Sequence, residues 1–235
     1  MNKILPFATA LVLAAGATVF WPNGNSGSSL TALGAAQAQE GEVDTSIVTE
    51  MALGDPDAPV TVIEYASATC PHCKNFHLTV FDELKENYVD TGKIRFVYRE
   101  VYFDRFGLWA GMLARCGAPR GADADPAQIE ASQRRYFAIM DMVFEQQSDW
   151  LNADTPAGIA DNLSQIGRTA GLSAEMVDEC LQDADMAQAM VTLWEENQAA
   201  DDITSTPSFI IDGQKYSNMN YADFSAALDE RLPEE

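Results

Sequence analysis

The alternation of hydrophobic and polar positions predicts strands in two places, with a long helical segment between them. Residues 60–66 are rich in β-branched side chains and nearly continuous in hydrophobicity, which is typical of a buried central strand. Residues 94–101 show the same pattern, and apolar side chains recur at helical spacing over residues 73–88 between them. A strand, a helix and a second strand form the unit from which parallel sheets are built. A shorter edge strand is expected over residues 47–53.

A helical segment follows the second buried strand. Its apolar side chains repeat with the period of a helix, and its breaks carry proline, glycine and capping residues, which mark helix boundaries. The pattern predicts amphipathic helices over residues 107–115, 127–146, 157–170, 174–182 and 184–200. The alanine and methionine side chains of this segment are typical of a helical core rather than of a cofactor site.

The chain then returns to strand-like patterns. A strand is predicted over residues 208–211, a hairpin turn at residues 212–213, and a return strand from residue 215. Residues 221–232 are expected to form the last helix. The element order predicts an α/β fold in which a helical block interrupts a strand-containing domain.

The N-terminal segment is expected to direct export. Lys3 precedes an almost wholly apolar run over residues 4–20, and residues 36–38 form the small-x-small tripeptide Ala-Gln-Ala that signal peptidase cleaves. Cleavage is expected after Ala38. The alternative is an uncleaved membrane anchor, although this run, interrupted by Pro6, is shorter than the roughly 20 residues that span a bilayer. Export leads to an oxidising compartment, where cysteine pairs can persist as disulfides.

These observations divide the chain into four parts. Residues 1–38 are the expected signal peptide, residues 39–104 and 201–235 the two parts of the strand-containing domain, and residues 105–200 the helical insertion. No internal repeat is evident in this organisation.

Composition and charge narrow the possible partners. The 235 residues are 47% hydrophobic and 21% charged, which excludes a disordered or collagen-like chain. Lys and Arg total 14 against 36 Asp and Glu, a formal net charge of −22. Such a surface repels nucleic-acid phosphate and anionic lipid, so no nucleic acid is expected as a partner.

Cys70, Pro71, His72 and Cys73 follow the first buried strand and open the helix after it. A thiol at a helix N-terminus faces unpaired backbone N–H groups and the positive end of the helix dipole, which stabilise its thiolate. His72 can add to this effect, and Thr69 is expected to cap the helix. Cys70 is then the accessible sulfur, and Cys73, on the inward face, the resolving thiol. A static disulfide is the alternative, although so short a loop contributes little stability.

No cofactor and no metal are expected at this motif. Haem attachment requires histidine directly after the second cysteine, where the chain has Lys74. Zinc held by Cys70, Cys73 and His77 would lack a fourth ligand nearby. The motif therefore favours a redox-active cysteine pair.

The whole arrangement resembles the DsbA family of thiol:disulfide oxidoreductases in the thioredoxin superfamily. The resemblance rests on the Cys-Pro-His-Cys motif between strand and helix, the helical insertion, and Thr206 and Pro207 before a strand, and it covers residues 47–232. It implies a thioredoxin-like fold with a helical insertion, with Cys70 as nucleophile and Cys73 as resolving thiol. It also implies that Pro207 is the cis-proline that exposes backbone to an unfolded substrate, and that Thr206 tunes redox behaviour. An ordinary loop proline is the alternative.

Glu64, on the first buried strand, matches the acidic residue that the family places beneath the second cysteine. A buried carboxylate there can accept the proton of Cys73 during exchange. The alternative is a glutamate at a sheet edge that reaches water. The lysine that pairs with this carboxylate in some relatives has no evident counterpart, and Arg99 is only a loose substitute. His77 is expected to serve packing.

Cys116 and Cys180 lie outside the motif, in the helical segment. Some DsbA-like proteins carry a second, structural disulfide in this region, and the resemblance implies that these two cysteines form one. An oxidising compartment favours such pairing, although four cysteines allow three connectivities. Two buried free thiols are the alternative.

The motif and the resemblance together favour a periplasmic dithiol oxidase. Its Cys70–Cys73 disulfide is expected to pass to unfolded or reduced exported proteins, and the resemblance implies a membrane reoxidant of the DsbB type. A disulfide isomerase or reductase is the second hypothesis, because isomerase relatives also carry threonine before the cis-proline. A periplasmic binding chaperone without exchange chemistry is the third.

Overall fold

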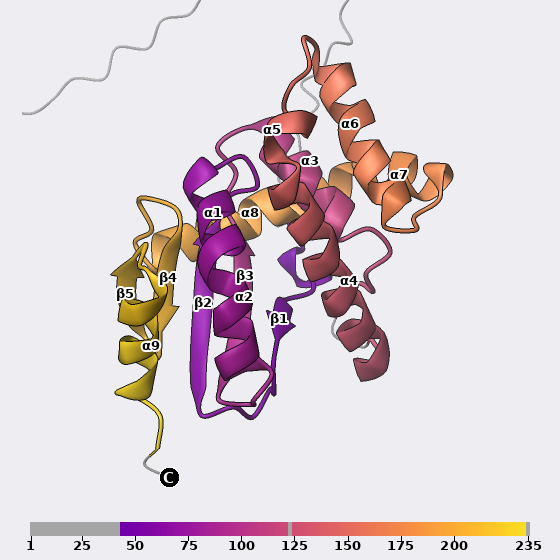
Figure 1. Ribbon diagram of the computed structural model, residues 1–235. Coiled ribbons are helices and arrows are strands. Elements are labelled where there is room, and N and C mark those ends of the chain that lie inside the picture. The colour runs from indigo at the N-terminus through magenta and orange to yellow at the C-terminus, as the bar shows by residue number, and fades with distance from the viewer. Residues whose placement is uncertain (1–42, 122–123, 234–235) are drawn as a thin grey trace, which may run out of the picture. The chain divides into compact units, whose positions relative to one another are not determined.

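The computed structural model describes residues 43–121 and 124–233, which contain a five-stranded sheet with helices around it (Figure 1). The expected signal peptide, residues 1–38, lies outside the described residues. Among the helices that are described, none is long and apolar enough to cross a membrane.

The sheet has the strand order β1-β3-β2-β4-β5. Its strands are β1 (Met51–Leu53), β2 (Val60–Ala66), β3 (Ile94–Glu100), β4 (Ser208–Ile211) and β5 (Gln214–Ser217). β2 and β3 run parallel, and the other neighbouring strands run antiparallel. This arrangement confirms the predicted strand–helix–strand unit and places β2 in the centre. The hairpin between β4 and β5 turns where predicted, at Asp212 and Gly213, whose φ angles are 47° and 80°.

The helix after β2 contains two wider turns. It begins as α1 (Pro71–Phe76), continues through α2 (Asp82–Leu84), and has π-helical stretches at His77–Phe81 and Lys85–Val89. The helix predicted over residues 73–88 is therefore confirmed. Wide turns of this kind frequently lie at functional sites, and the first of them begins one turn after the motif.

The expected cap of this helix at Thr69 is wrong. Cys70 occupies the position before the first helical residue, and the Thr69 hydroxyl instead donates to Asp104 Oδ2 at 3.0 Å. The other oxygen of Asp104 accepts the backbone N–H groups of Phe106 and Gly107 at the start of the next helix. The turn before Cys70 is thus tied to the helical insertion.

Helices fill the segment between β3 and β4. They are α3 (Arg105–Ala114), α4 (Pro126–Glu145), α5 (Gln147–Trp150), α6 (Pro156–Thr169), α7 (Ala174–Leu181) and α8 (Ala184–Ala200), and α9 (Tyr221–Asp229) follows β5. The five helices predicted in this segment match α3, α4, α6, α7 and α8 within two residues at each end. The short helix α5 was not predicted, and the edge strand β1 begins only at Met51, four residues later than predicted, after a 3₁₀ turn at Thr45–Ile47.

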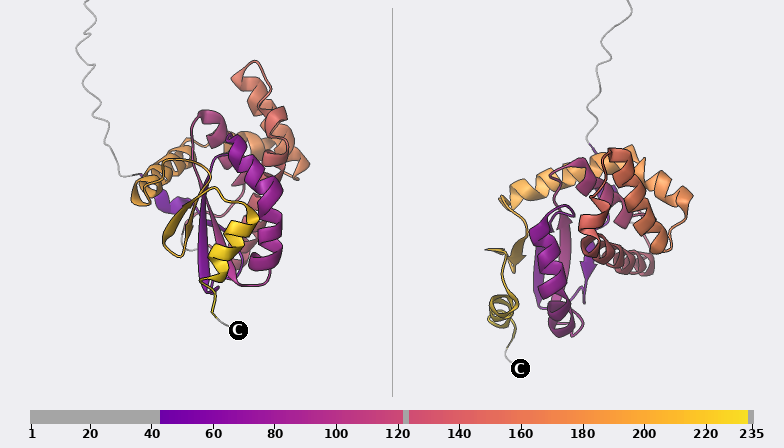
Figure 2. Two further views of the ribbon diagram at one scale, coloured as in Figure 1. Left: turned by 60° about the vertical axis from the view of Figure 1, so that its left-hand side comes forward. Right: turned by 45° about the horizontal axis from the view of Figure 1, so that its top comes forward.

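Helices cover both faces of the sheet. α1, α2 and α9 lie on one face, where Phe76 packs against Phe209 and Phe224 in the main core (Figures 1 and 2). On the other face, Trp194 of α8 packs beside Tyr65 of β2. Side chains of α3, α4, α6 and α7 belong to the main core as well, so the insertion and the sheet share one core.

Candidate active site

The carboxyl end of β2 delivers the Cys-Pro-His-Cys motif to the centre of the sheet. The backbone N–H of Cys70 donates to the carbonyl oxygen of Ser67 at 3.1 Å, and Pro71 follows as the first residue of α1. Both motif cysteines are thiols in this structure. Cys70 is 8% exposed and Cys73 is fully buried, so an incoming sulfur reaches Cys70 first.

Cys70 is held as a thiolate near neutral pH, because its pKa is lowered to about 5. The largest cause is a hydrogen bond with the Cys73 thiol, which the burial of Cys70 partly opposes. Hydrogen bonds from the backbone N–H groups of Cys73 and His72 lower the pKa further. The helix N-terminus therefore acts as the sequence predicts, and His72 contributes through its backbone N–H.

The environment of Cys73 has the opposite effect. Burial raises the pKa of the Cys73 thiol far above its ordinary value, and the hydrogen bond with Cys70 and the negative charge of Glu64 raise it further. The first sulfur is thus a thiolate with limited access to solvent, and the second is a fully buried thiol. This asymmetry fits a nucleophile and a resolving thiol.

The peptide bond between Thr206 and Pro207 is cis, as the resemblance implies. It faces the nucleophile, since Cys70 Sγ lies 3.6 Å from the carbonyl oxygen of Thr206, to which the protonated thiol can donate. The hydroxyl oxygen of Thr206 is buried and has no hydrogen-bond partner among the described residues. The structure therefore brings Thr206 beside the dithiol, and β4 begins directly after Pro207.

Glu64 lies beneath the dithiol and is fully buried, so the alternative of an edge glutamate that reaches water is wrong. Its partner is His77, whose Nε2 lies 2.9 Å from Glu64 Oε2. His77 is 4% exposed and stacks on Phe144 with 4.3 Å between the ring centroids. The second carboxylate oxygen, Oε1, has no hydrogen-bond partner in the described part of the chain. One oxygen is therefore held and the other is free to exchange a proton.

The contact between His77 and Glu64 was missed by the sequence analysis, which assigned His77 to packing alone. A signal was present, because His77 follows Cys73 by four positions and the two side chains therefore project from the same side of the helix. Glu64 shares a strand face with Val62 and Ala66, both of which belong to the core beneath that helix.

Arg99 is not a substitute for the missing lysine. Its Nη1 donates to the Tyr65 hydroxyl at 2.6 Å and pairs with Asp201 Oδ2 at 3.0 Å. Glu64 and Tyr65 are consecutive in β2, so their side chains point to opposite faces of the sheet. Burial and the hydrogen bond to Asp201 raise the pKa of Tyr65 to about 12, so this cluster keeps a neutral phenol.

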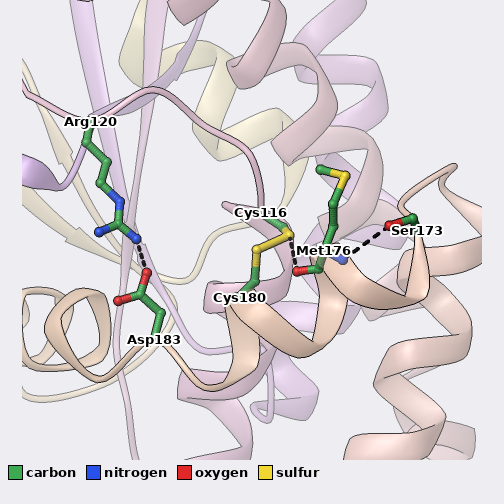
Figure 3. Close-up of a disulfide and its surroundings, with 6 residues drawn as sticks. All are labelled: Cys116, Arg120, Ser173, Met176, Cys180 and Asp183. Atoms are coloured by element: carbon green, nitrogen blue, oxygen red, sulfur yellow. Dashed lines mark hydrogen bonds and ion pairs between the residues drawn. A yellow bond between two sulfur atoms is a disulfide. The ribbon is translucent and has the colours of Figure 1, made fainter.

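Cys116 and Cys180 are joined by a disulfide in the helical insertion, the pairing that the resemblance implies (Figure 3). Their Cα atoms are 5.6 Å apart, and Cys116 is 2% exposed. An ion pair between Arg120 and Asp183 lies beside the bond (Figure 3). The disulfide and the ion pair both join the segment after α3 to the region of α7.

Known proteins share this sequence pattern and this architecture. A family model described as Thioredoxin matches residues 46–230. A Rickettsia bellii protein that carries the name of a protein-disulfide oxidoreductase is 31% identical over 202 residues, which cover 83% of this chain and 72% of that protein. Other Rickettsia relatives with such names are 30% identical, and the chain spans 61% to 63% of their length.

Two further similarities extend beyond Rickettsia. The disulfide bond formation protein D of Bacillus subtilis is 24% identical over 188 residues, which cover 80% of this chain and 79% of that protein. The crystal structure of alpha-DsbA1 from Wolbachia pipientis matches with a TM-score of 0.64 at 29% identity, covering 77% of this chain and 90% of that one. The matched region contains both the sheet and the helical insertion.

Proposed function

The chain belongs to the DsbA-like family of thiol:disulfide oxidoreductases in the thioredoxin superfamily, and we propose that it is a dithiol oxidase that introduces disulfides into exported proteins. The observation that carries the proposal is the contrast between the two motif thiols. The pKa of Cys70 is lowered to about 5, whereas burial raises that of Cys73. A stabilised thiolate stabilises the reduced protein, which makes its disulfide a stronger oxidant.

In the proposed reaction, a substrate thiolate attacks Cys70 Sγ of the Cys70–Cys73 disulfide. The new bond joins the substrate sulfur to Cys70, and the electron pair of the broken bond leaves on Cys73. A second substrate thiolate then attacks the substrate sulfur of this mixed disulfide, and Cys70 leaves as a thiolate. The substrate gives up two electrons and two protons; the protein takes both electrons and one proton, and the other proton enters solvent.

The proton of Cys73 is assigned to Glu64 in this scheme. Cys73 is fully buried, so its proton needs a nearby carrier, and the charge of Glu64, whose second oxygen has no partner among the described residues, acts on this thiol. Glu64 donates a proton to the Cys73 sulfur when the Cys70–Cys73 bond breaks, and it accepts that proton again when the dithiol is reoxidised. His77 holds the other carboxylate oxygen and so fixes the orientation of Glu64.

Replacing Glu64 with glutamine tests this assignment. Glu64→Gln keeps the shape of the side chain but cannot carry the proton, so we expect reoxidation by glutathione disulfide to slow on the order of 10-fold to 100-fold. The reduction potential is expected to change less than the rate. Stopped-flow kinetics between pH 5 and pH 9 measure both the rate and its pH profile.

The matched control is Glu50→Gln, which neutralises an exposed carboxylate paired with Arg95 and should leave the kinetics unchanged. A Glu64→Gln protein with the wild-type rate at every pH would show that Glu64 carries no proton in the reaction. A melting temperature close to that of the wild type is also expected, because the amide can still contact His77.

The proposed site of action is the periplasm. The apolar run and the Ala-Gln-Ala tripeptide within residues 1–38 support export, and a disulfide such as that between Cys116 and Cys180 persists in an oxidising compartment. The proposed substrates are reduced, unfolded exported chains that pair with the backbone beside Pro207. The proposed reoxidant is a membrane protein of the DsbB type.

The reduction potential of the full mature chain tests the proposed direction. After equilibration with glutathione, a reduction potential of about −120 mV, typical of DsbA, is expected, whereas one of about −270 mV, typical of thioredoxin, contradicts an oxidase. A second assay separates oxidase from isomerase. The oxidised protein should form disulfides in a reduced substrate, and the reduced protein should not accelerate the repair of a scrambled one.

A further inference from the structure

The first residue of α5 contacts the backbone that carries the nucleophile. Gln147 is 4% exposed, and its Nε2 donates to the carbonyl oxygen of Ala68 at 2.8 Å and to that of Cys70 at 3.0 Å. These carbonyls lie 79 and 77 positions away in the sequence, in the turn between β2 and α1. One amide of the helical insertion therefore binds the active-site turn at two points.

The short helix α5 is itself anchored by other parts of the insertion. Trp150, at its end, is 2% exposed, and its indole N–H donates to the carbonyl oxygen of Val143 in α4 at 2.9 Å. The carbonyl oxygen of Trp150 accepts from Asn162 of α6 at 3.3 Å. Contacts with α4 and α6 therefore hold α5 in place in addition to the bonds that Gln147 makes to the turn.

The two bound carbonyls lie next to the peptide groups that stabilise the sulfur. The backbone N–H groups of His72 and Cys73 donate to the Cys70 thiolate, so the orientation of the peptide groups in this turn decides how well the sulfur anion is stabilised. A donor on the carbonyls of Ala68 and Cys70 withdraws negative charge from them and fixes the planes of their peptide groups. Without the Gln147 donor, the carbonyl oxygen of Cys70 keeps only the backbone N–H of Lys74, at 3.1 Å, and that of Ala68 loses its side-chain partner, which favours rearrangement of the turn.

We propose that Gln147 is a positioning residue through which the helical insertion sets the stability of the Cys70 thiolate. The effect of Gln147 on the thiolate does not depend on the proposed function. Only the conclusion that Gln147 thereby sets the oxidising strength of the protein rests on it. Because the contact comes from the insertion, any change in the packing of α5 against α4 and α6 is transmitted to the reactive sulfur.

Gln147→Met in the full mature chain removes both donors and keeps the length of the side chain. We expect the pH midpoint for alkylation of Cys70 in the reduced protein to rise by about one unit, a tenfold weaker acid. The same tenfold change in the stability of the thiolate makes the reduction potential about 30 mV less oxidising. Both quantities are measured against the wild-type chain, by iodoacetamide kinetics and by equilibration with glutathione.

Gln133→Met is the matched control. Gln133 of α4 also donates its amide to a backbone carbonyl, that of Glu50, at 2.9 Å, but away from the motif. Its loss should lower the melting temperature without moving the midpoint of Cys70. The titratable and charged groups on the elements next to Cys70 are kept in every variant: Glu64, His72, Cys73, Lys74, Asp104 and Asp149.

Gln147→Glu provides a second variant if Gln147→Met does not fold. It keeps the shape of the side chain but turns a carboxylate toward the two carbonyls, so a larger rise of the midpoint is expected. An unchanged midpoint in either folded variant overturns the proposal, whatever its melting temperature. The potential of the wild-type chain decides the oxidase proposal separately, so the two can fail independently.

Discussion

Cys70→Ser abolishes disulfide exchange, whereas Cys73→Ser is expected to accumulate mixed disulfides with its substrates. The first variant lacks the sulfur that is open to attack. The second keeps Cys70, with its pKa lowered to about 5 in the wild type, but has no thiol to release a captured substrate. The Cys70→Ser variant should have no detectable exchange activity, which is one of the two largest effects expected for this protein.

Non-reducing electrophoresis and mass spectrometry of the trapped species measure this difference. Cys116→Ala with Cys180→Ala is a control that removes two cysteines and should keep exchange, because the dithiol is untouched. Mixed disulfides that form through Cys73 in a Cys70→Ser protein would contradict the assigned order of the two sulfurs.

The pH dependence of the reduced protein follows from the same thiol. Cys70 titrates near 5 in the folded protein, against 9.0 for an ordinary thiol, so the unfolded chain binds the proton more tightly. The resulting stabilisation of the reduced fold is complete above about pH 9 and is lost as the pH falls through about 5. We therefore expect the melting temperature of the reduced protein to fall, relative to the oxidised one, on acidification toward pH 5.

The regular elements could be predicted because their signals are local. The helix expected over residues 184–200 and the strand expected over residues 208–211 have those bounds in α8 and β4. The four residues of α5 carry no such signal, because their conformation depends on buried contacts of Gln147 and Trp150 with distant segments. The cap at Thr69 was wrong because the helix begins at Pro71, which puts Cys70 in the cap position, and the Thr69 hydroxyl donates to the distant Asp104.

The residues of the candidate site also differ in whether local sequence signals predict them. Cys70 and Cys73 could be predicted from one motif, because the helix N-terminus that activates the first thiol is built by the same few residues. Thr206 lies 136 positions from Cys70 and entered only through a family resemblance. To predict that His77 contacts Glu64, one must know which face of β2 carries Glu64 and which side of the helix carries His77. Neither of these alone indicates a contact.

Removing the second disulfide is expected to have the other large effect. Cys116→Ala with Cys180→Ala opens a link between residues separated by 64 positions, and a loop of that length contributes about 4 kcal/mol on the chain-entropy model. Domains of this kind are stable by roughly 5–15 kcal/mol, so the loss is a large part of the total. For a chain of this size it corresponds to a melting temperature lower by about 10 °C.

Urea denaturation of the oxidised mature chain measures this loss, and mass spectrometry of the alkylated, non-reduced protein checks the pairing. The control is Arg120→Ala, which breaks the neighbouring ion pair with Asp183 and should cost far less, since exposed ion pairs contribute about 0–1 kcal/mol. Recovery of Cys116 and Cys180 as alkylated thiols would falsify the pairing. An unchanged denaturation midpoint in the double variant would instead mean that the bond does not stabilise the fold, because packing of α3 against α7 would then hold this part of the insertion without it.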